Sequence, residues 1–243
     1  MRNKIAQVNN IRLLTAAGRA LSTRDIGVPG IGLIWGPTGF GKSTAAAWFA
    51  IRTNAVYVRA MATWTPTAML AAIMHELDAK PLPRCAAMIE FIVGALAREG
   101  RPLFVDEADY LAASAKLLDS LRDLHDMSTV PLILIGMKDF QRRVMHREQI
   151  AGRVSQWVEF QAADFKDARI LADEVCEVRI ADDLLARLHR ATGGSMRGMV
   201  VGLSRIEGFA REHGLQKVSE TDWGERAFVL SQAPKAPKIN IGT

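Results

Sequence analysis

Short apolar runs alternate with segments of helical periodicity along the first two thirds of this chain. The apolar runs predict five buried strands, at residues 31–35, 55–59, 102–106, 131–135 and 157–160. Helices are predicted from Lys42, from Pro66 with Thr65 as its cap, over about 86–99 up to Gly100, and along the leucine stripe of residues 117–124. Strands that alternate with helices predict a mostly parallel sheet covered on both faces.

The pattern changes near residue 164. From there the sequence predicts only helices, at 167–176, 182–191 and 195–213, with Gly193 and Gly194 separating the last two. We therefore expect a core at residues 1–163 and a small helical domain at 164–228. The proline-bearing end, 229–243, lacks periodicity and is predicted to be a flexible tail.

Composition narrows the class of protein. With 243 residues, 49% of them hydrophobic and 23% charged, the chain is expected to be an ordinary globular protein. No apolar run is long enough to span a bilayer, and residues 1–10 lack a signal core, so we expect a cytoplasmic protein without membrane contact. The two distant cysteines predict neither a disulfide framework nor a metal site. The net charge of +5 favours a polyanionic partner.

The stretch GPTGFGKST has the spacing of a phosphate-binding loop between a strand and a helix. Its glycines let backbone N–H groups surround a phosphate, and the following helix presents its positive end to the same anion. Lys42 is expected to reach the β- and γ-phosphates, and the Ser43 hydroxyl to ligate Mg²⁺. The predicted ATP-binding residues of the loop are Gly36, Pro37, Thr38, Gly39, Phe40, Gly41, Lys42, Ser43 and Thr44.

The stretch PLFVDEAD places two acids at the carboxyl end of a predicted strand. Asp106 is expected to reach the Mg²⁺ shell, and Glu107 to orient the water that attacks the γ-phosphate. A second acid intended for water favours ATP hydrolysis over transfer of phosphate to a small metabolite. The chain is thus predicted to be a Mg²⁺-dependent ATPase.

Hydrolysis at such a site usually needs an arginine against the transition state. Arg153, which follows the fourth strand, is the first candidate for insertion into the site of a neighbouring subunit, and Arg147 is the second. Either could instead form a surface ion pair. Arg197, at the start of a helix in the second domain, is a candidate sensor of bound nucleotide.

Together with the phosphate loop, the runs LFVDEADYL, LRDLHDMSTVPLILIGM, GRV and GGSMR resemble AAA+ ATPases of the phage Mu MuB type, and more distantly TnsC and TniB. This resemblance implies an AAA+ core with a helical lid, and ATP bound between adjacent subunits. Arg153 would be the trans arginine and Arg197 the second sensor. It also implies helical filaments on double-stranded DNA, selection of target DNA and its delivery to a DDE transposase. Met137 departs from the polar first sensor common in such proteins.

The resemblance also suggests where DNA is contacted. The candidates lie in the segment RAMATWTPT and on a later helix, and comprise Arg59, Thr63, Trp64, Thr65 and Lys116. Trp64 could equally pack beneath the next helix. Three rival functions stay open at this stage: a helicase-loader ATPase of the DnaC or IstB kind, a secretion-linked ATPase resembling ExeA, and a small-molecule kinase.

Overall fold

The computed structural model describes residues 1–228 and divides into two compact units. One unit comprises Ile5–Ala163, and among the described residues the other comprises Met1–Lys4 together with residues 164–228. Residues 1–4 therefore group with the helical unit rather than with the core, to which the sequence analysis assigns them. The predicted tail at 229–243 lies outside the described residues.

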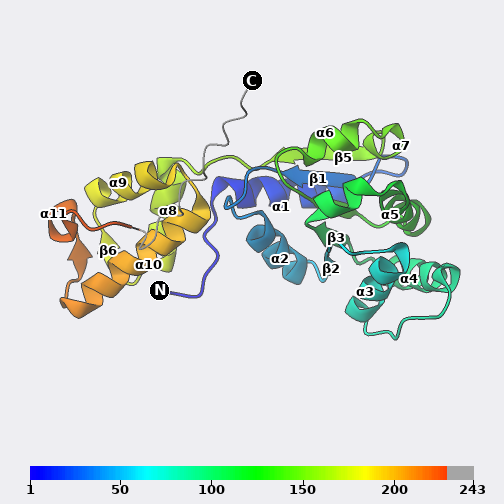
Figure 1. The fold of residues 1–243 in the computed structure, drawn as a ribbon, viewed down its shortest axis with the longest axis horizontal. Coiled ribbons are helices and arrows are strands. Elements are labelled where there is room, and N and C mark those ends of the chain that lie inside the picture. The colour runs from blue at the N-terminus through cyan, green and yellow to red at the C-terminus, as the bar shows by residue number, and fades with distance from the viewer. Residues whose placement is uncertain (229–243) are drawn as a thin grey trace, which may run out of the picture. The chain divides into compact units, whose positions relative to one another are not determined.

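The core unit contains a parallel sheet of five strands in the order β2-β3-β4-β1-β5. Figure 1 labels β1, β2, β3 and β5 of this sheet. The strands are β1 (Ile31–Trp35), β2 (Val56–Arg59), β3 (Leu103–Asp106), β4 (Leu132–Ile135) and β5 (Val154–Glu159). All five predicted strands are confirmed. The fifth begins at Val154 rather than at 157, because polar Ser155 and Gln156 on this edge strand hide its first half from a search for apolar runs.

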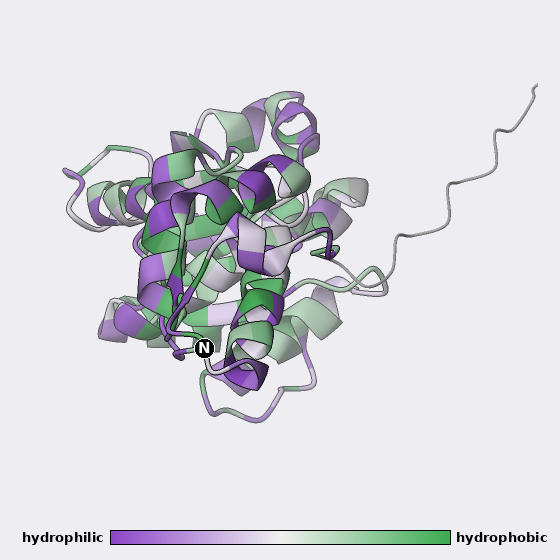
Figure 2. Ribbon diagram, turned by 90° about the vertical axis from the view of Figure 1, so that its left-hand side faces the viewer, coloured by the Kyte–Doolittle hydropathy of each residue, from purple (hydrophilic) through white to green (hydrophobic). Residues whose placement is uncertain are grey.

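Helices cover both faces of the sheet. One face is packed by α1 (Asn9–Ser22) and α2 (Lys42–Arg52). The opposite side chains of the strands join a cluster with residues of α3 (Pro66–Glu76), α4 (Cys85–Glu99), α5 (Ala115–Ser128), α6 (Phe140–Met145) and α7 (Glu148–Ala151). In the hydropathy view, green central strands lie among helices banded with purple (Figure 2). The strand order and the helices on both faces are those of an AAA+ P-loop core, as the resemblance implies.

Side-chain alternation decides which residues of a strand meet which layer. Val56, Val58 and Val105 point into the cluster beneath α3 to α7. Phe104, one position out of step, contacts Phe49 of α2, with ring centroids 6.1 Å apart. Asp106 has the same parity as Phe104, so the end of β3 presents its carboxylate to the face covered by α2.

The second unit is built mainly from α8 (Phe165–Val175), α9 (Asp182–Thr192), α10 (Met196–Glu212) and α11 (Glu220–Trp223). The expectation that strands disappear after residue 164 is wrong, because β6 (Arg179–Ile180) and β7 (Lys217–Val218) form a parallel pair. Each has two residues, too few to show a period. The amine of Met1 lies 2.7 Å from the buried Glu207 carboxylate, and Arg2 N–H donates to Val175 O, which ties residues 1–4 to this unit.

The two cysteines, Cys85 and Cys176, are free thiols in the described part of the chain. Burial raises the pKa of Cys176 to about 12, so this thiol stays protonated and inert. Within residues 1–228, the helices are all too short or too polar to cross a membrane.

Candidate active site

The phosphate loop connects the carboxyl end of β1 to the first turn of α2. Gly36 has φ of 150°, and a Cβ at this position would lie 2.4 Å from the carbonyl oxygen of Phe160. Gly41 precedes the helix in the left-handed region, with φ of 87°. A side chain fits neither position without strain. Lys42 Nζ donates to the carbonyl oxygens of Gly36 and Pro37, at 2.7 and 2.9 Å, which folds its ammonium over the loop.

Asp106 and Glu107 lie at the same edge of the sheet as the loop, because β1 and β3 run parallel and both end there. Asp106 is only 2% exposed. It faces α2, the helix that carries Ser43 in its first turn. A serine hydroxyl and a carboxylate are hard oxygen donors that suit Mg²⁺ completed by phosphate and water oxygens. Within residues 1–228 no cluster of three or more His, Cys, Asp or Glu could hold a metal ion.

Two hydrogen bonds fix the Asp106 carboxylate. The Glu107 N–H donates to Oδ1 at 2.9 Å, and the Tyr57 hydroxyl on β2 donates to Oδ2 at 2.8 Å. Burial, together with the neighbouring Asp106 charge, raises the pKa of Tyr57, so its hydroxyl remains a donor at neutral pH. Sequence reasoning missed Tyr57. The available signal was the alternation VYVR in β2, which leaves a tyrosine and an arginine on one face.

Glu107 adopts an unusual backbone conformation, with φ of 54°, at the start of the short 3₁₀ helix η1 (Ala108–Ala113). A non-glycine residue in the left-handed region costs about 1 kcal/mol or more and is concentrated at functional sites. Its Oε1 accepts from Arg59 Nη2 at 3.0 Å. Arg59 lies directly opposite Asp106 in the register of β2 and β3, which explains its reach to the next residue.

At the end of β4, Met137 takes the position of the expected first sensor, and its side chain is exposed. Its N–H donates to Asp109 Oδ2 at 2.7 Å. Burial raises the pKa of Asp109, although the hydrogen bond from Met137 and the charge of Arg143 oppose this shift. The polar group at this end of β4 is therefore a carboxylate from η1 rather than the Met137 side chain.

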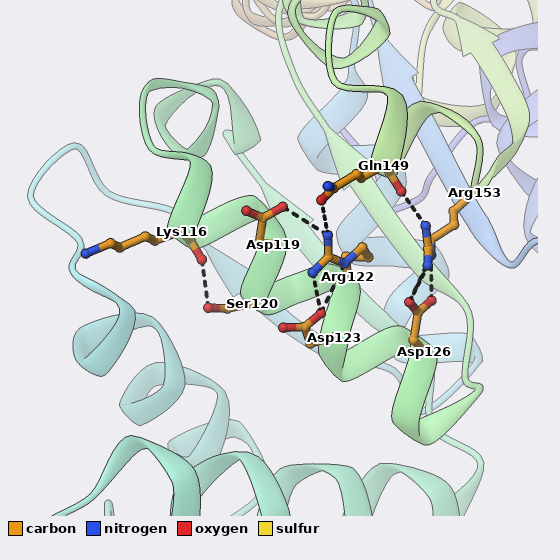
Figure 3. Close-up of polar contacts among 8 residues, drawn as sticks. All are labelled: Lys116, Asp119, Ser120, Arg122, Asp123, Asp126, Gln149 and Arg153. Carbon is orange, nitrogen blue, oxygen red and sulfur yellow. Dashed lines mark hydrogen bonds and ion pairs between the residues drawn. The ribbon is translucent and has the colours of Figure 1, made fainter.

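Arg153 lies at the amino ends of the parallel strands, whereas the phosphate loop lies at their carboxyl ends. The Arg153 carbonyl accepts from Ile31 N–H, at the start of β1, whereas the loop follows the end of β1. Because β1 has five residues, its amino and carboxyl ends are about 16 Å apart. Figure 3 shows the guanidinium held by Asp126 of α5: Nε donates to both carboxylate oxygens, and Nη2 lies 2.8 Å from Oδ2. Nη1 donates to Gln149 O at 2.6 Å.

The two other arginine candidates have different surroundings. Arg147 is half-buried and donates from Nη2 to the carbonyl of Ala112 at 3.1 Å. Arg197 is exposed in the first turn of α10, which Ser195 caps by accepting from Gly198 N–H. Arg197 belongs to the second unit, whereas the loop and both acids belong to the core unit.

The candidate DNA contacts separate into engaged and exposed side chains. Arg59 is paired with Glu107, and the Thr65 side chain accepts from Ala68 N–H at the start of α3. Trp64 is half-buried and packs against the core cluster, in keeping with the alternative that it packs beneath the next helix. Thr63 and Lys116 are exposed.

A comparison with protein families matches residues 25–144 to the model of an AAA domain. The matched span includes the phosphate loop, Asp106 and Glu107, and ends within α6, before Arg153. No curated protein matches the sequence of this chain. The MuB-type resemblance therefore stays a prediction.

Several solved structures share the fold. The ORC2 protein of Aeropyrum pernix, solved as ADPNP-ADP complexes, is similar with a TM-score of 0.69 and 18% identity, covering 91% of this chain and 68% of that one. The ORC1 protein of the same organism, in complex with DNA, has a TM-score of 0.62 and 19% identity, and the match covers 88% of this chain and 62% of that one. A point variant of Thermotoga maritima RuvB has a TM-score of 0.61 and 20% identity, and the match covers 90% of this chain and 67% of that one. This chain thus spans about two thirds of each solved chain, and the likeness concerns the fold.

Proposed function

We propose that this chain, whose core is an AAA-family ATPase domain, hydrolyses ATP between adjacent copies of itself and uses the cycle to control assembly on duplex DNA. ATP and Mg²⁺ are the proposed cofactors. The further proposal is that the assembly selects target DNA without strong sequence preference and delivers it to a DDE transposase.

The position of Arg153 is the observation that supports an active site shared between adjacent subunits. The phosphate loop and both acids lie at the carboxyl edge of the sheet, whereas Arg153 lies at the amino edge and is held there by Asp126. It therefore cannot serve the loop of its own subunit. The contacts to Asp126 and Gln149 use one N–H group on each of its three nitrogen atoms, the Nε–H being shared between both carboxylate oxygens. A guanidinium has five N–H groups, so two remain for a phosphate brought by a neighbour.

In the proposed reaction, the residues at the carboxyl ends of the strands have separate roles. Bound Mg²⁺, held by Ser43 and Asp106, supplies charge neutralisation at the phosphates. The Lys42 ammonium turns from the loop carbonyls to the phosphate oxygens. Because Arg59 engages Oε1 of Glu107, Oε2 is the oxygen that orients the water and accepts its proton.

Three observations support DNA as the partner of the assembly. The chain has a net charge of +5, and the ORC1 protein that shares its fold was solved in complex with DNA. The side chains of Thr63 and Lys116 are exposed, so we prefer these two residues as contacts to DNA phosphates. The transposition role is supported by the resemblance of the runs around residues 103–137 to MuB-type proteins. The helicase-loader function is the competing proposal.

Electron microscopy with ATP and random duplex DNA tests the proposal. Wild-type protein should coat the DNA, Glu107→Gln should give more persistent filaments because ATP is retained, and Lys42→Ala should give none. Binding should weaken steeply with added salt if several phosphates are contacted. Monomers under all conditions would contradict the assembly. A helicase loader would instead bind and remodel a replicative helicase and would not stimulate transposase-mediated strand transfer.

A further inference from the structure

Tyr57 contacts the carboxylate that the proposed function assigns to the metal shell. Its hydroxyl donates to Asp106 Oδ2 at 2.8 Å across the β2–β3 pair, while the Glu107 N–H donates to Oδ1 at 2.9 Å. Asp106 is 2% exposed, so water has little access to replace either donor. One donor on each oxygen fixes the rotation of the carboxylate group.

We propose that Tyr57 is a positioning residue that holds Asp106 in the orientation required by the Mg²⁺ of a bound nucleotide. This inference rests on the proposed role of Asp106. The torsion that turns a carboxylate has broad minima, so a single hydrogen bond constrains it weakly. Each carboxylate oxygen accepts more than one hydrogen bond. The ion or one of its waters can therefore still bind Asp106 while Tyr57 holds it.

The packing of β2 does not require the hydroxyl. Val56 and Val58 supply the buried contacts of this strand to the cluster on the other face, and a phenylalanine ring would occupy the space of the Tyr57 ring. What phenylalanine cannot do is donate to Asp106. Partners that orient metal ligands typically contribute about 10- to 100-fold in metal affinity or activity.

The test is a Mn²⁺ titration of protein with bound ADP, followed by electron paramagnetic resonance. Tyr57→Phe should weaken Mn²⁺ binding by roughly 10- to 100-fold. Its affinity for ADP in the presence of EDTA should remain within about twofold of wild type, because the phosphate loop is unchanged. The matched control is Tyr110→Phe. Tyr110 is the other tyrosine of the chain and is 48% exposed, so this change should leave Mn²⁺ binding as in wild type.

A double substitution separates positioning from a general disturbance. If Tyr57 acts through Asp106, then Tyr57→Phe should cause no further loss of Mn²⁺ affinity in an Asp106→Asn background. Wild-type Mn²⁺ affinity in Tyr57→Phe, or an equal loss in both backgrounds, would overturn this inference alone. A wild-type protein that binds ADP but recruits no Mn²⁺ with it would overturn the proposed metal site as well.

Discussion

Replacing Arg153 by alanine tests whether the active site is shared between subunits. The change removes the ion pair with Asp126, but both side chains are more than a third exposed, at 39% and 36%. Exposed pairs contribute at most about 1 kcal/mol, so the fold should persist. An arginine that contacts the transferring phosphate contributes about 10³-fold or more to the rate. The expected loss in hydrolysis thus corresponds to roughly 4 kcal/mol in the barrier and far exceeds the loss in stability.

The assay is ATP turnover by mixed subunits. Arg153→Ala keeps its phosphate loop and Glu107, and Glu107→Gln keeps its arginine, so each variant alone should be inactive. Equal mixing should restore about a quarter of the wild-type rate, because about one contact in four then joins an intact site to an intact arginine. A folding defect in either variant could not be rescued in this way.

Arg122→Ala is the matched control. Arg122 lies beside Arg153 in Figure 3 and is paired with Asp119 and Asp123, whose carboxylates are 39% and 50% exposed although Arg122 itself is only 18% exposed. Its removal should leave turnover within about twofold of wild type, since surface pairs contribute little. The shared-site argument is refuted if Arg153→Ala hydrolyses ATP normally, or if mixing restores nothing while both variants assemble with wild type.

Three further changes have defined outcomes. Gly36→Ala places a Cβ 2.4 Å from Phe160 O and should weaken binding of a fluorescent ATP analogue by about tenfold or more, with unchanged binding arguing against a rigid loop. Thr65→Ala removes the cap of α3 and should lower the free energy of unfolding by about 1 kcal/mol in urea titrations. Burial lowers the pKa of His125, despite its hydrogen bond to Val130 O, so unfolding takes up a proton as pH falls below about 6.5. Thermal stability should decline from that pH to the lower pKa of the folded state, and His125→Gln should lack this decline.

Much of the core could be predicted because its signals are local. The apolar run of β1, the glycine spacing after it and the proline at the start of α3 each lie within a few residues. The helix α1 is not among the predicted elements, although Ile11, Leu14 and Leu21 form a buried stripe whose spacing is typical of an amphipathic helix. The shortest elements, β6 and β7, contain too few residues for a period to appear.

The contacts within the site could not be predicted in the same way. Both Arg59 and Tyr57 meet acids nearly 50 positions away in sequence. Those meetings depend on the register of β2 against β3, in which Arg59 lies opposite Asp106. A shift of one residue would turn both side chains to the other face. Composition and spacing within one strand contain no information about that register.

The parallel direction of the strands explains why we expect ATP hydrolysis by this chain to require assembly. In a parallel sheet, all carboxyl ends gather at one edge, and here this edge receives the phosphate loop and the two acids. Arg153 precedes β5 and therefore falls at the other edge, where Asp126 orients it. Contacts that join one edge to the opposite edge of the next copy are heterologous, so repeating them produces a ring or a helical filament. A linear polyanion such as duplex DNA matches the second outcome, because each added subunit extends both the protein contact and the row of phosphate contacts.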